Sequence, residues 1–378
     1  MDRDSLKSIG FVGMIIVGGA SVLLPVAAAA FMALVSSAWA MPLGNVSALW
    51  GSLAALSALL GVWLAAQGIG GLRGRPSPPF HLPSPWLWIV GFALAAGALA
   101  IAPRNPTVVG VASVLSALFP GLALLSLASR RLIHETRPAT WRQMAAQTGA
   151  TLTLSLWWSM ILEILALIAL ALIAGILLGA APGGTDWLQQ WSERWSDPSA
   201  ILGGEMLQQP VVIAFLLVLL SGFVPVIEEI GKLLAVGMLA LARRPSRAQA
   251  VMWGITCGAT FSIYEAAFAN PFAGTGAMIA VMRVGALLVH CCAAGMTALG
   301  LYEWISLHRA RYFYLSLALS MALHAAWNAL AVISSAALST DGAATGSAGA
   351  VAVAGFVLLS LGAASVLARI TKTEPVEL

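Results

Sequence analysis

The sequence predicts an all-α fold: a polytopic transmembrane helix bundle of about ten spans with both termini in the cytoplasm. The first observation behind this prediction is composition, because 60% of the 378 residues are hydrophobic and only 9% are charged. Soluble domains carry charge on about a quarter of their residues. The second is the recurrence of apolar runs of roughly 20 residues, the length that a helix needs to cross the hydrocarbon. The third is an uneven distribution of basic residues between the two sides of the predicted bundle.

The apolar runs define the predicted spans. The first run, 9–35, exceeds the core of about 7 to 15 residues of a signal peptide, so we expect it to remain as a span. The other nine predicted spans are 46–67, 86–102, 108–129, 148–180, 211–242, 251–269, 278–302, 312–336 and 350–369.

Basic residues predict the orientation of the bundle. With both termini inside, fifteen of the nineteen Lys and Arg residues fall in cytoplasmic segments, and only Arg104 and Arg194 fall outside. Lys232 and Arg283 lie within spans. This distribution follows the positive-inside rule and accounts for the net charge of +4 without a nucleic-acid partner. We therefore expect a multi-pass protein of the inner (plasma) membrane, with the lipid bilayer as its surroundings.

The order of spans predicts four parts: an accessory five-span region at 1–180, an outer loop at 181–210, a polar-lined membrane core at 211–336, and a final span with a short tail at 337–378. In the outer loop Trp187, Trp191 and Trp195 recur every four positions on one helical face. That spacing predicts an interfacial anchor, with a gate for substrate as the alternative.

Cysteine usage excludes two kinds of site. Cys257, Cys291 and Cys292 all fall inside predicted spans. They have neither the spacing of a zinc knuckle nor the exposed positions of a disulfide framework. We expect them to be small residues of the core.

The most unusual stretch of the sequence is an apolar span that contains Glu228, Glu229 and Lys232. An ionisable residue at the centre of a membrane helix costs roughly 2.5 to 3.5 kcal/mol unless it is paired or hydrated. Lys232 follows the two glutamates at spacings of four and three residues, so its side chain is expected to reach either carboxylate. The two glutamates point about 100° apart, so they are expected to have different partners.

Other polar residues lie at the same predicted depth. A rise of 1.5 Å per residue, counted from the cytoplasmic end of each span, puts the polar groups of four helices roughly 18 to 23 Å into the membrane. They are Glu228, Glu229, Glu265, His290 and His324. The free-energy cost of burying such groups in a membrane is lowest when they share one site inside the bundle. Phe261 shares a helix face with Glu265, Arg283 with His290, and Asn328 with His324.

This constellation suits the activation of water. A carboxylate and a histidine can together deprotonate a water molecule, and Asn328 can donate to a developing oxyanion. Glu265, His290 and His324 are also acceptable ligands for a catalytic Zn²⁺. Spacing does not separate a metal-free site from a zinc site. A purely structural polar network is the third interpretation, and Glu163, which stands alone in its span, is either a packing residue or a participant.

Common protease signatures do not occur: the sequence has no HExxH, no GxSxG and no paired intramembrane aspartates. Four motifs on successive spans instead resemble, in order and spacing, those of the PrsW family of intramembrane proteases. They are EEIGK (Glu228–Lys232), FSIYE (Phe261–Glu265), Arg283 with His290, and HAAWN (His324–Asn328). The resemblance covers about a third of the chain, from Val211 to Ile333, and extends distantly to the type II CAAX prenyl endopeptidases.

The resemblance implies a membrane-embedded peptidase that acts on membrane-anchored proteins, anti-sigma-factor-like regulators among them. It implies Glu228 as the general base, His324 as its partner or a ligand, and Asn328 as the oxyanion donor. From the residues themselves we expect Glu229, Glu265 and His290 to take part in activating water, and Lys232 to tune the glutamate pair. Glu265 stands where the CAAX enzymes have histidine. The alternatives are an ion- or proton-coupled transporter, which the crowding of polar groups into one half of the chain disfavours, and a silent scaffold that binds transmembrane helices.

Overall fold

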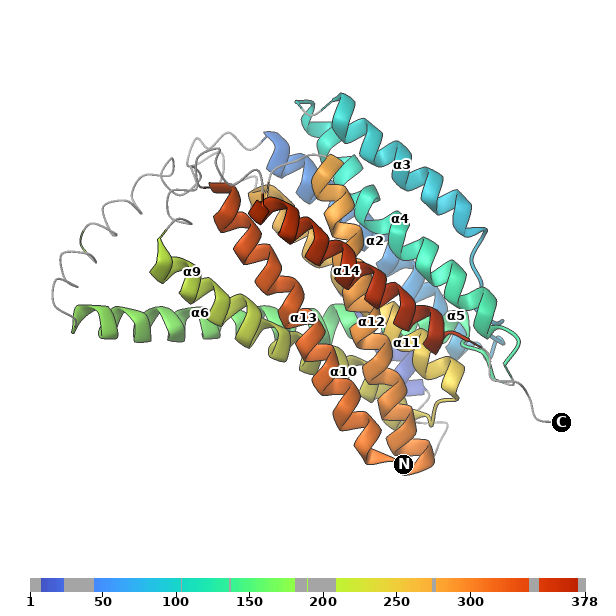
Figure 1. The fold of residues 1–378 in the computed structure, drawn as a ribbon. Helices are drawn as coiled ribbons and strands as arrows, with labels where there is room; N and C mark the ends of the chain where they lie inside the picture. Colours follow the sequence, from blue (N-terminus) through green and yellow to red (C-terminus); the bar gives the residue numbers. More distant parts are fainter. Residues whose placement is uncertain are drawn as a thin grey trace.

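The computed structural model describes residues 8–23, 44–102, 104–135, 137–180, 189, 209–273, 277–339 and 347–372. Within these ranges the chain forms helices and no strand (Figure 1). An apolar helix at Ser8–Leu23 comes first. The helices that follow are α2 (Gly44–Leu72), α3 (Pro85–Ile101), α4 (Pro106–Leu132), α5 (Trp141–Ala150), α6 (Leu156–Gly179), α9 (Pro210–Leu216), α10 (Val224–Ala242), α11 (Arg247–Ala273), α12 (Ala277–Leu307), α13 (Ala310–Ser339) and α14 (Ser347–Ile370).

Seven of the described helices are long and apolar enough to cross a membrane, which makes the chain a multi-pass membrane protein. The predicted total of ten is not confirmed. The helix at Ser8–Leu23 and α3 are apolar but shorter. Helix α11 is long, yet polar residues such as Gln249, Thr256 and Thr260 lower its hydropathy. These side chains are buried against other helices, so α11 does not need the apolar surface of a lipid-facing span. The predicted tryptophan face at Trp187, Trp191 and Trp195 lies outside the described residues.

One end of the bundle collects segments that the sequence places on the same side of the membrane. The Nη1 of Arg247 lies 3.2 Å from the Oε1 of Glu135, and its Nη2 donates to the carbonyl oxygen of Ile370 at 3.0 Å. The hydroxyl of Ser246 donates to the carbonyl oxygen of Arg137. The turn after α4, the start of α11 and the end of α14 therefore meet at one end. Which side of the membrane this end faces stays a prediction.

Helices α11 and α12 form the centre of the fold, and α12 also packs against α13, α14 and α10. Two glycines allow the close approach of α11 to α12. A Cβ atom on Gly254 would overlap the carbonyl oxygen of Ala294, and one on Gly258 would overlap that of His290. Small residues at a four-residue spacing let membrane helices touch backbone to backbone. The three cysteines are buried here with free thiols, as predicted for core residues.

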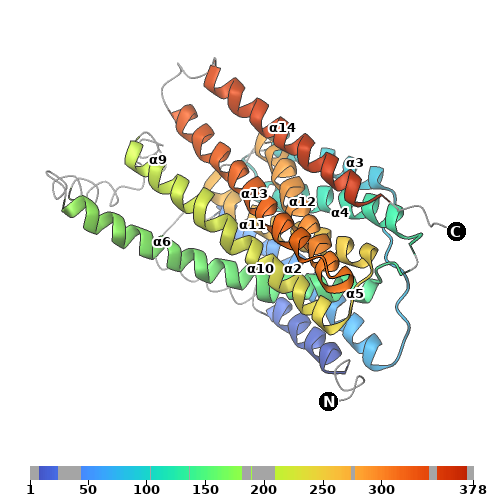
Figure 2. The same ribbon diagram turned by 60° about the horizontal axis from the view of Figure 1, so that its bottom comes forward.

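Two long helices change to π-helical geometry beside this centre. The segment η1 (Thr151–Ser155) joins α5 to α6, and η3 (Leu217–Phe223) joins α9 to α10. Such segments occur frequently at functional sites. Helix α10 packs against η1, and α13 packs against η3. Helix α6 lies at the edge of the bundle (Figure 2), and of its side chains, all of which are described, only Ser159 is buried. The division of the chain into an accessory region and a core at residue 180 stays a proposal.

Candidate active site

Helix α10 contributes an ion triplet that is almost completely removed from the surface. The Nζ of Lys232 lies 2.7 Å from the Oε1 of Glu229 and 3.2 Å from the Oε2 of Glu228. The side chain of Lys232 is 1% exposed, and those of Glu228 and Glu229 are also buried. Helical spacing predicts both contacts, and the structure confirms them.

Gly231 places a different face of α10 against the neighbouring helix. A Cβ atom at this position would lie 3.0 Å from the hydroxyl of Ser159 and 3.2 Å from the carbonyl oxygen of Ser155. These distances are shorter than ordinary van der Waals contact, so only glycine fits without a shift of η1 or α6. The absence of a side chain at Gly231 thus sets the position of the helix that carries the two glutamates.

His290 on α12 connects Lys232 to Glu265. Its Nδ1 lies 2.7 Å from the Nζ of Lys232, and its Nε2 lies 2.8 Å from the Oε2 of Glu265. An ammonium group can only donate hydrogen bonds, so Nδ1 is the acceptor and the ring proton belongs on Nε2, facing the carboxylate. The ring of Phe261 lies beneath the ammonium, 4.4 Å from Nζ to the ring centroid.

His324 on α13 has the complementary arrangement. Its Nδ1 lies 3.0 Å from the Oε1 of Glu229, and its Nε2 lies 3.8 Å from the Oε2 of Glu228. An ionised carboxylate only accepts hydrogen bonds, so Nδ1 carries the proton and the lone pair of Nε2 faces Glu228. The two imidazole rings are 4.7 Å apart between centroids and nearly perpendicular.

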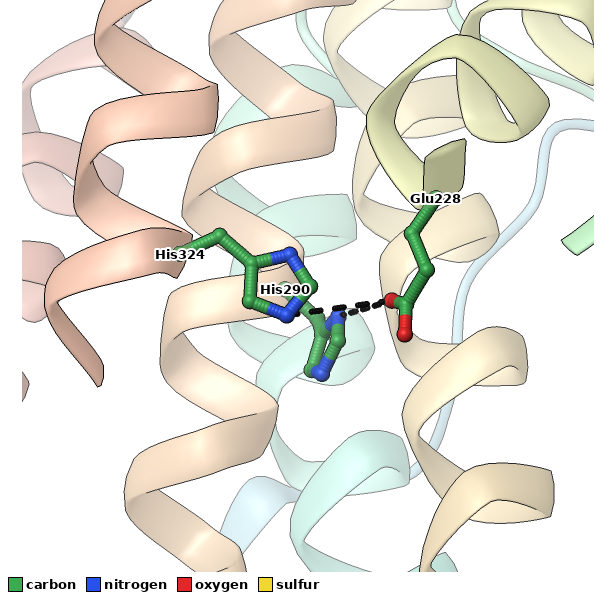
Figure 3. Close-up of side chains that lie close together, drawn as sticks. All are labelled: Glu228, His290 and His324. Carbon is green, nitrogen blue, oxygen red and sulfur yellow. Dashed lines mark ion pairs between the residues drawn. The ribbon is translucent and has the colours of Figure 1, made fainter. Parts of the chain in front are cut away.

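Glu228, His290 and His324 point toward one another from three helices (Figure 3). One ligand atom from each residue lies within 4.8 Å of the other two, and all three side chains are buried. Two imidazole nitrogens and a carboxylate oxygen form a donor set that Zn²⁺ accepts in catalytic sites. Each histidine also gives its other ring nitrogen to a carboxylate, Glu265 or Glu229, as metal-ligating histidines commonly do. The residues present therefore fit a divalent metal ion.

The charge of the cluster agrees with this fit. Among the described residues the cluster contains the carboxylates Glu163, Glu228, Glu229 and Glu265 against the cations Lys232 and Arg283. With all of them ionised, four negative and two positive charges leave an excess of two negative charges. Uncompensated charge is expensive inside a membrane, so the cluster requires either a divalent cation or the protonation of two carboxylates.

The structure groups Glu228 with the two histidines, whereas the sequence predicts Glu265 as their partner in the metal set. The helix rotations explain the difference. Helix α11 presents Glu265 to the outer nitrogen of His290, and α10 turns Glu228 toward the space between the rings. Metal ligation by any of these residues stays a prediction.

Glu265 is also where the cluster reaches the protein surface. Its side chain is 34% exposed, and it pairs with Arg283, which is 20% exposed, at 3.3 Å from Oε1 to Nη1. The two carboxylates of the ion triplet, Glu228 and Glu229, are buried. Glu265, which lies beside His290, is therefore a point at which the cluster is accessible from outside the protein.

Asn328 lies one helical turn from His324 but contacts a different partner. Its Nδ2 donates to the carbonyl oxygen of Leu220 in η3 at 2.8 Å. A side-chain amide carries two N–H groups, so this bond uses one of them. The structure thus ties Asn328 to the π-helical segment, and its role toward an oxyanion stays a prediction.

For Glu163 the sequence leaves two roles open, packing between helices or participation in the site. It lies on α6, is partly exposed, and interacts electrostatically with Glu265, Lys232 and Glu228. No motif surrounds it, and the signal that it carries in the sequence is that of an ionisable residue within a span. The choice between participation and simple packing stays a prediction.

Comparison with known proteins gives one finding. The profile of the PrsW family intramembrane metalloprotease matches residues 148–361, more than half of the chain, and this range includes every residue of the cluster. No curated protein matches the chain, and no solved structure matches it. The four motifs, the buried Glu–His–His group and the multi-pass helical fold agree with the profile. The chain therefore belongs to the PrsW family of intramembrane metalloproteases.

Proposed function

We propose that this protein hydrolyses peptide bonds of membrane-anchored proteins, within or beside their transmembrane segments, in the inner (plasma) membrane of the cell. One observation carries the proposal: a carboxylate and two imidazoles from three separate helices converge in a buried space inside a membrane protein of a protease family. A substrate with a membrane anchor reaches such a site by diffusion in the bilayer. Regulators of the anti-sigma-factor kind are one class of protein with this anchoring.

The proposed water-activating pair is Glu228 and His324. The separation of 3.8 Å between Oε2 and Nε2 is too long for a direct hydrogen bond, and it leaves both atoms able to contact one water molecule. When this water attacks the peptide carbonyl carbon, its proton passes to the Glu228–His324 pair. The same proton then goes to the nitrogen of the leaving amide, so the pair acts first as base and then as acid.

The remaining residues position and balance this pair. Glu229 fixes the orientation of His324, and Glu265 does the same for His290. Lys232 compensates the charge of both glutamates on α10. Asn328, one turn from His324, donates its second N–H group to the oxyanion of the tetrahedral intermediate. In the metal-dependent form, which is the alternative to a metal-free Glu228–His324 pair, Glu228, His290 and His324 would hold a Zn²⁺ that would polarise the carbonyl group and lower the pKa of water.

Quantitative N-terminal proteomics on membranes tests the proposal. Cells express the intact protein, the variant Glu228→Gln, or the matched control Glu303→Gln, which makes the same change at the end of α12 beside Arg309. We expect new N-termini within or beside transmembrane segments with the intact protein and the control, and none with Glu228→Gln. Equal cleavage by Glu228→Gln would overturn the assignment. If the intact protein yields no new termini, transport or helix binding becomes the better explanation.

A further inference from the structure

We propose that Lys232 competes with the metal ion. The ammonium group and a divalent cation would bind the same atoms, the Nδ1 of His290 and the Oε2 of Glu228, and so exclude one another. Metal loading then requires Lys232 to leave His290. This competition presupposes the metal-dependent form of the proposed function and adds a means by which the protein controls its own metal site.

Lys232 already contacts two of the three residues that would hold the metal ion. Its Nζ lies 2.7 Å from the Nδ1 of His290 and 3.2 Å from the Oε2 of Glu228. Two of the three residues of the Glu228–His290–His324 group therefore already contact a positive charge. The positive charge in this space is thus a side chain of the protein itself, the ammonium group of Lys232.

The Nδ1 of His290 can bind only one of the two cations at a time. The Nδ1 of a neutral imidazole has one lone pair, which either accepts a hydrogen bond or binds a metal. It cannot do both, because a Zn–N bond of about 2.0 to 2.1 Å occupies the direction from which the ammonium donates. His290 has no second nitrogen to offer, since its Nε2 contacts Glu265. Exclusion at Nδ1 follows from these contacts.

Glu229 offers the ammonium of Lys232 an alternative position. The Oε2 of Glu229 is buried and, among the residues that the structure describes, has no hydrogen-bond partner. Lys232 already contacts the other oxygen of this carboxylate at 2.7 Å. The ammonium can thus release His290 and stay paired with Glu229. A buried acceptor without a partner is uncommon, and here it supplies the alternative position.

Competition of this kind has two consequences. In the metal-free protein, Lys232 holds the carboxylates and His290 together, so the site keeps its shape without an ion. A metal ion must also bind strongly enough to displace the ammonium, which disfavours Mg²⁺, an ion that prefers oxygen ligands, and favours Zn²⁺, which binds imidazole well.

Zinc affinity of the full chain tests this competition. The purified protein in detergent is stripped with a chelator, and Zn²⁺ is titrated against a chromophoric competitor. Lys232→Met removes the ammonium and its charge-assisted bond, so we expect Zn²⁺ to bind about tenfold more tightly or better. Arg283→Met is the matched control, since it removes one positive charge from the same cluster but contacts Glu265 and not the Nδ1 of His290. We expect no gain in affinity from this control.

Each result of the zinc titration either supports or overturns the competition between Lys232 and the metal ion. Unchanged or weaker zinc binding by Lys232→Met overturns the proposal, and an equal gain by Arg283→Met reduces it to general electrostatics and overturns it as well. If Lys232→Met does not fold, Phe261→Leu weakens the support of the ammonium by the ring at 4.4 Å and should give a smaller gain; no gain there overturns the proposal too.

The binding assay is independent of proteolysis. Cleavage that depends on Glu228 but persists in the metal-stripped protein, with no zinc binding by any variant, would refute the competition and leave the proposed function intact. Tight zinc binding that behaves as expected, together with no cleavage of any membrane protein, would do the reverse.

Discussion

His324 contacts both glutamates of α10, each through a different ring nitrogen: Nδ1 lies 3.0 Å from Glu229, and Nε2 lies 3.8 Å from Glu228. Two adjacent residues of one helix therefore act on opposite sides of one imidazole. Glu229 orients the ring, and Glu228 faces its free lone pair. The sequence predicts that the two glutamates point apart, but it does not predict that both face the same histidine ring.

We expect Glu229→Gln to lower kcat by about 10- to 100-fold, the usual effect of removing the partner that orients a ligand histidine. The amide keeps the volume of the carboxylate, but its NH₂ group can point at the Nδ1 proton of His324. Cleavage of a purified membrane substrate, followed in detergent, measures the effect. Glu303→Gln should be unchanged, and an unchanged kcat for Glu229→Gln would show that His324 needs no carboxylate.

Asn328→Leu separates the two roles of this side chain. Loss of an oxyanion donor lowers kcat by roughly 10²- to 10³-fold with little change in KM. Loss of the bond to Leu220 alone costs about 1 kcal/mol of stability. Thr297→Val, which removes the buried contact of Thr297 with Ser320 at 3.0 Å, serves as the control for stability. If both variants unfold at similar temperatures and cleave equally well, Asn328 is an anchor of η3 and not an oxyanion donor.

Gly258→Ala should destabilise the protein by about 1 to 3 kcal/mol, because the new methyl group overlaps the carbonyl oxygen of His290. It should also lower activity, since the backbone of the histidine must move. Gly237→Ala is the matched helical control: no neighbouring atom lies within 4 Å of the added Cβ, and alanine is favoured over glycine in a helix by roughly 0.5 to 1 kcal/mol. Thermal unfolding in detergent compares the two. Equal stability would mean that α11 and α12 can separate without cost.

Arg247→Ala removes the contacts that join Glu135 to the end of α14. We expect a lower unfolding temperature with kcat of the folded fraction unchanged, because this residue lies at the start of α11, far along the helix from Glu265. The test measures unfolding and single-turnover cleavage on the same preparation. A large loss of kcat without a loss of stability would indicate that this end of the bundle communicates with the cluster.

Helical periodicity predicts the parts of the site that lie on one helix. The contacts of Lys232 with Glu228 and Glu229 follow from spacing alone. Counting residues along the spans also brings His290 and His324 to the level of the glutamates, and the structure places them together. These predictions succeed because rise and rotation per residue are nearly constant in a helix.

Relationships between helices were harder to predict, since the rotation of one helix against its neighbour depends on packing. The choice of Glu228 over Glu265 beside the two histidines is of this kind, as is the ring nitrogen that each partner uses. The π-helical geometry of η1 and η3 leaves no clear mark in the sequence. A helix that is surrounded by protein needs less apolar surface than a helix that faces lipid. Helix α11 therefore falls outside the seven apolar spans, although it carries Glu265.

The contact between Gly258 and the backbone of His290 also bears on protein engineering. Replacing helical glycines by alanine is a common route to more robust membrane proteins for crystallisation or microscopy, and by helix propensity alone Gly258 is as good a candidate as Gly237. Only the second substitution leaves the neighbouring helix in place. A variant in which every helical glycine is replaced on helix propensity alone would therefore lose stability at Gly258 and displace the backbone of His290.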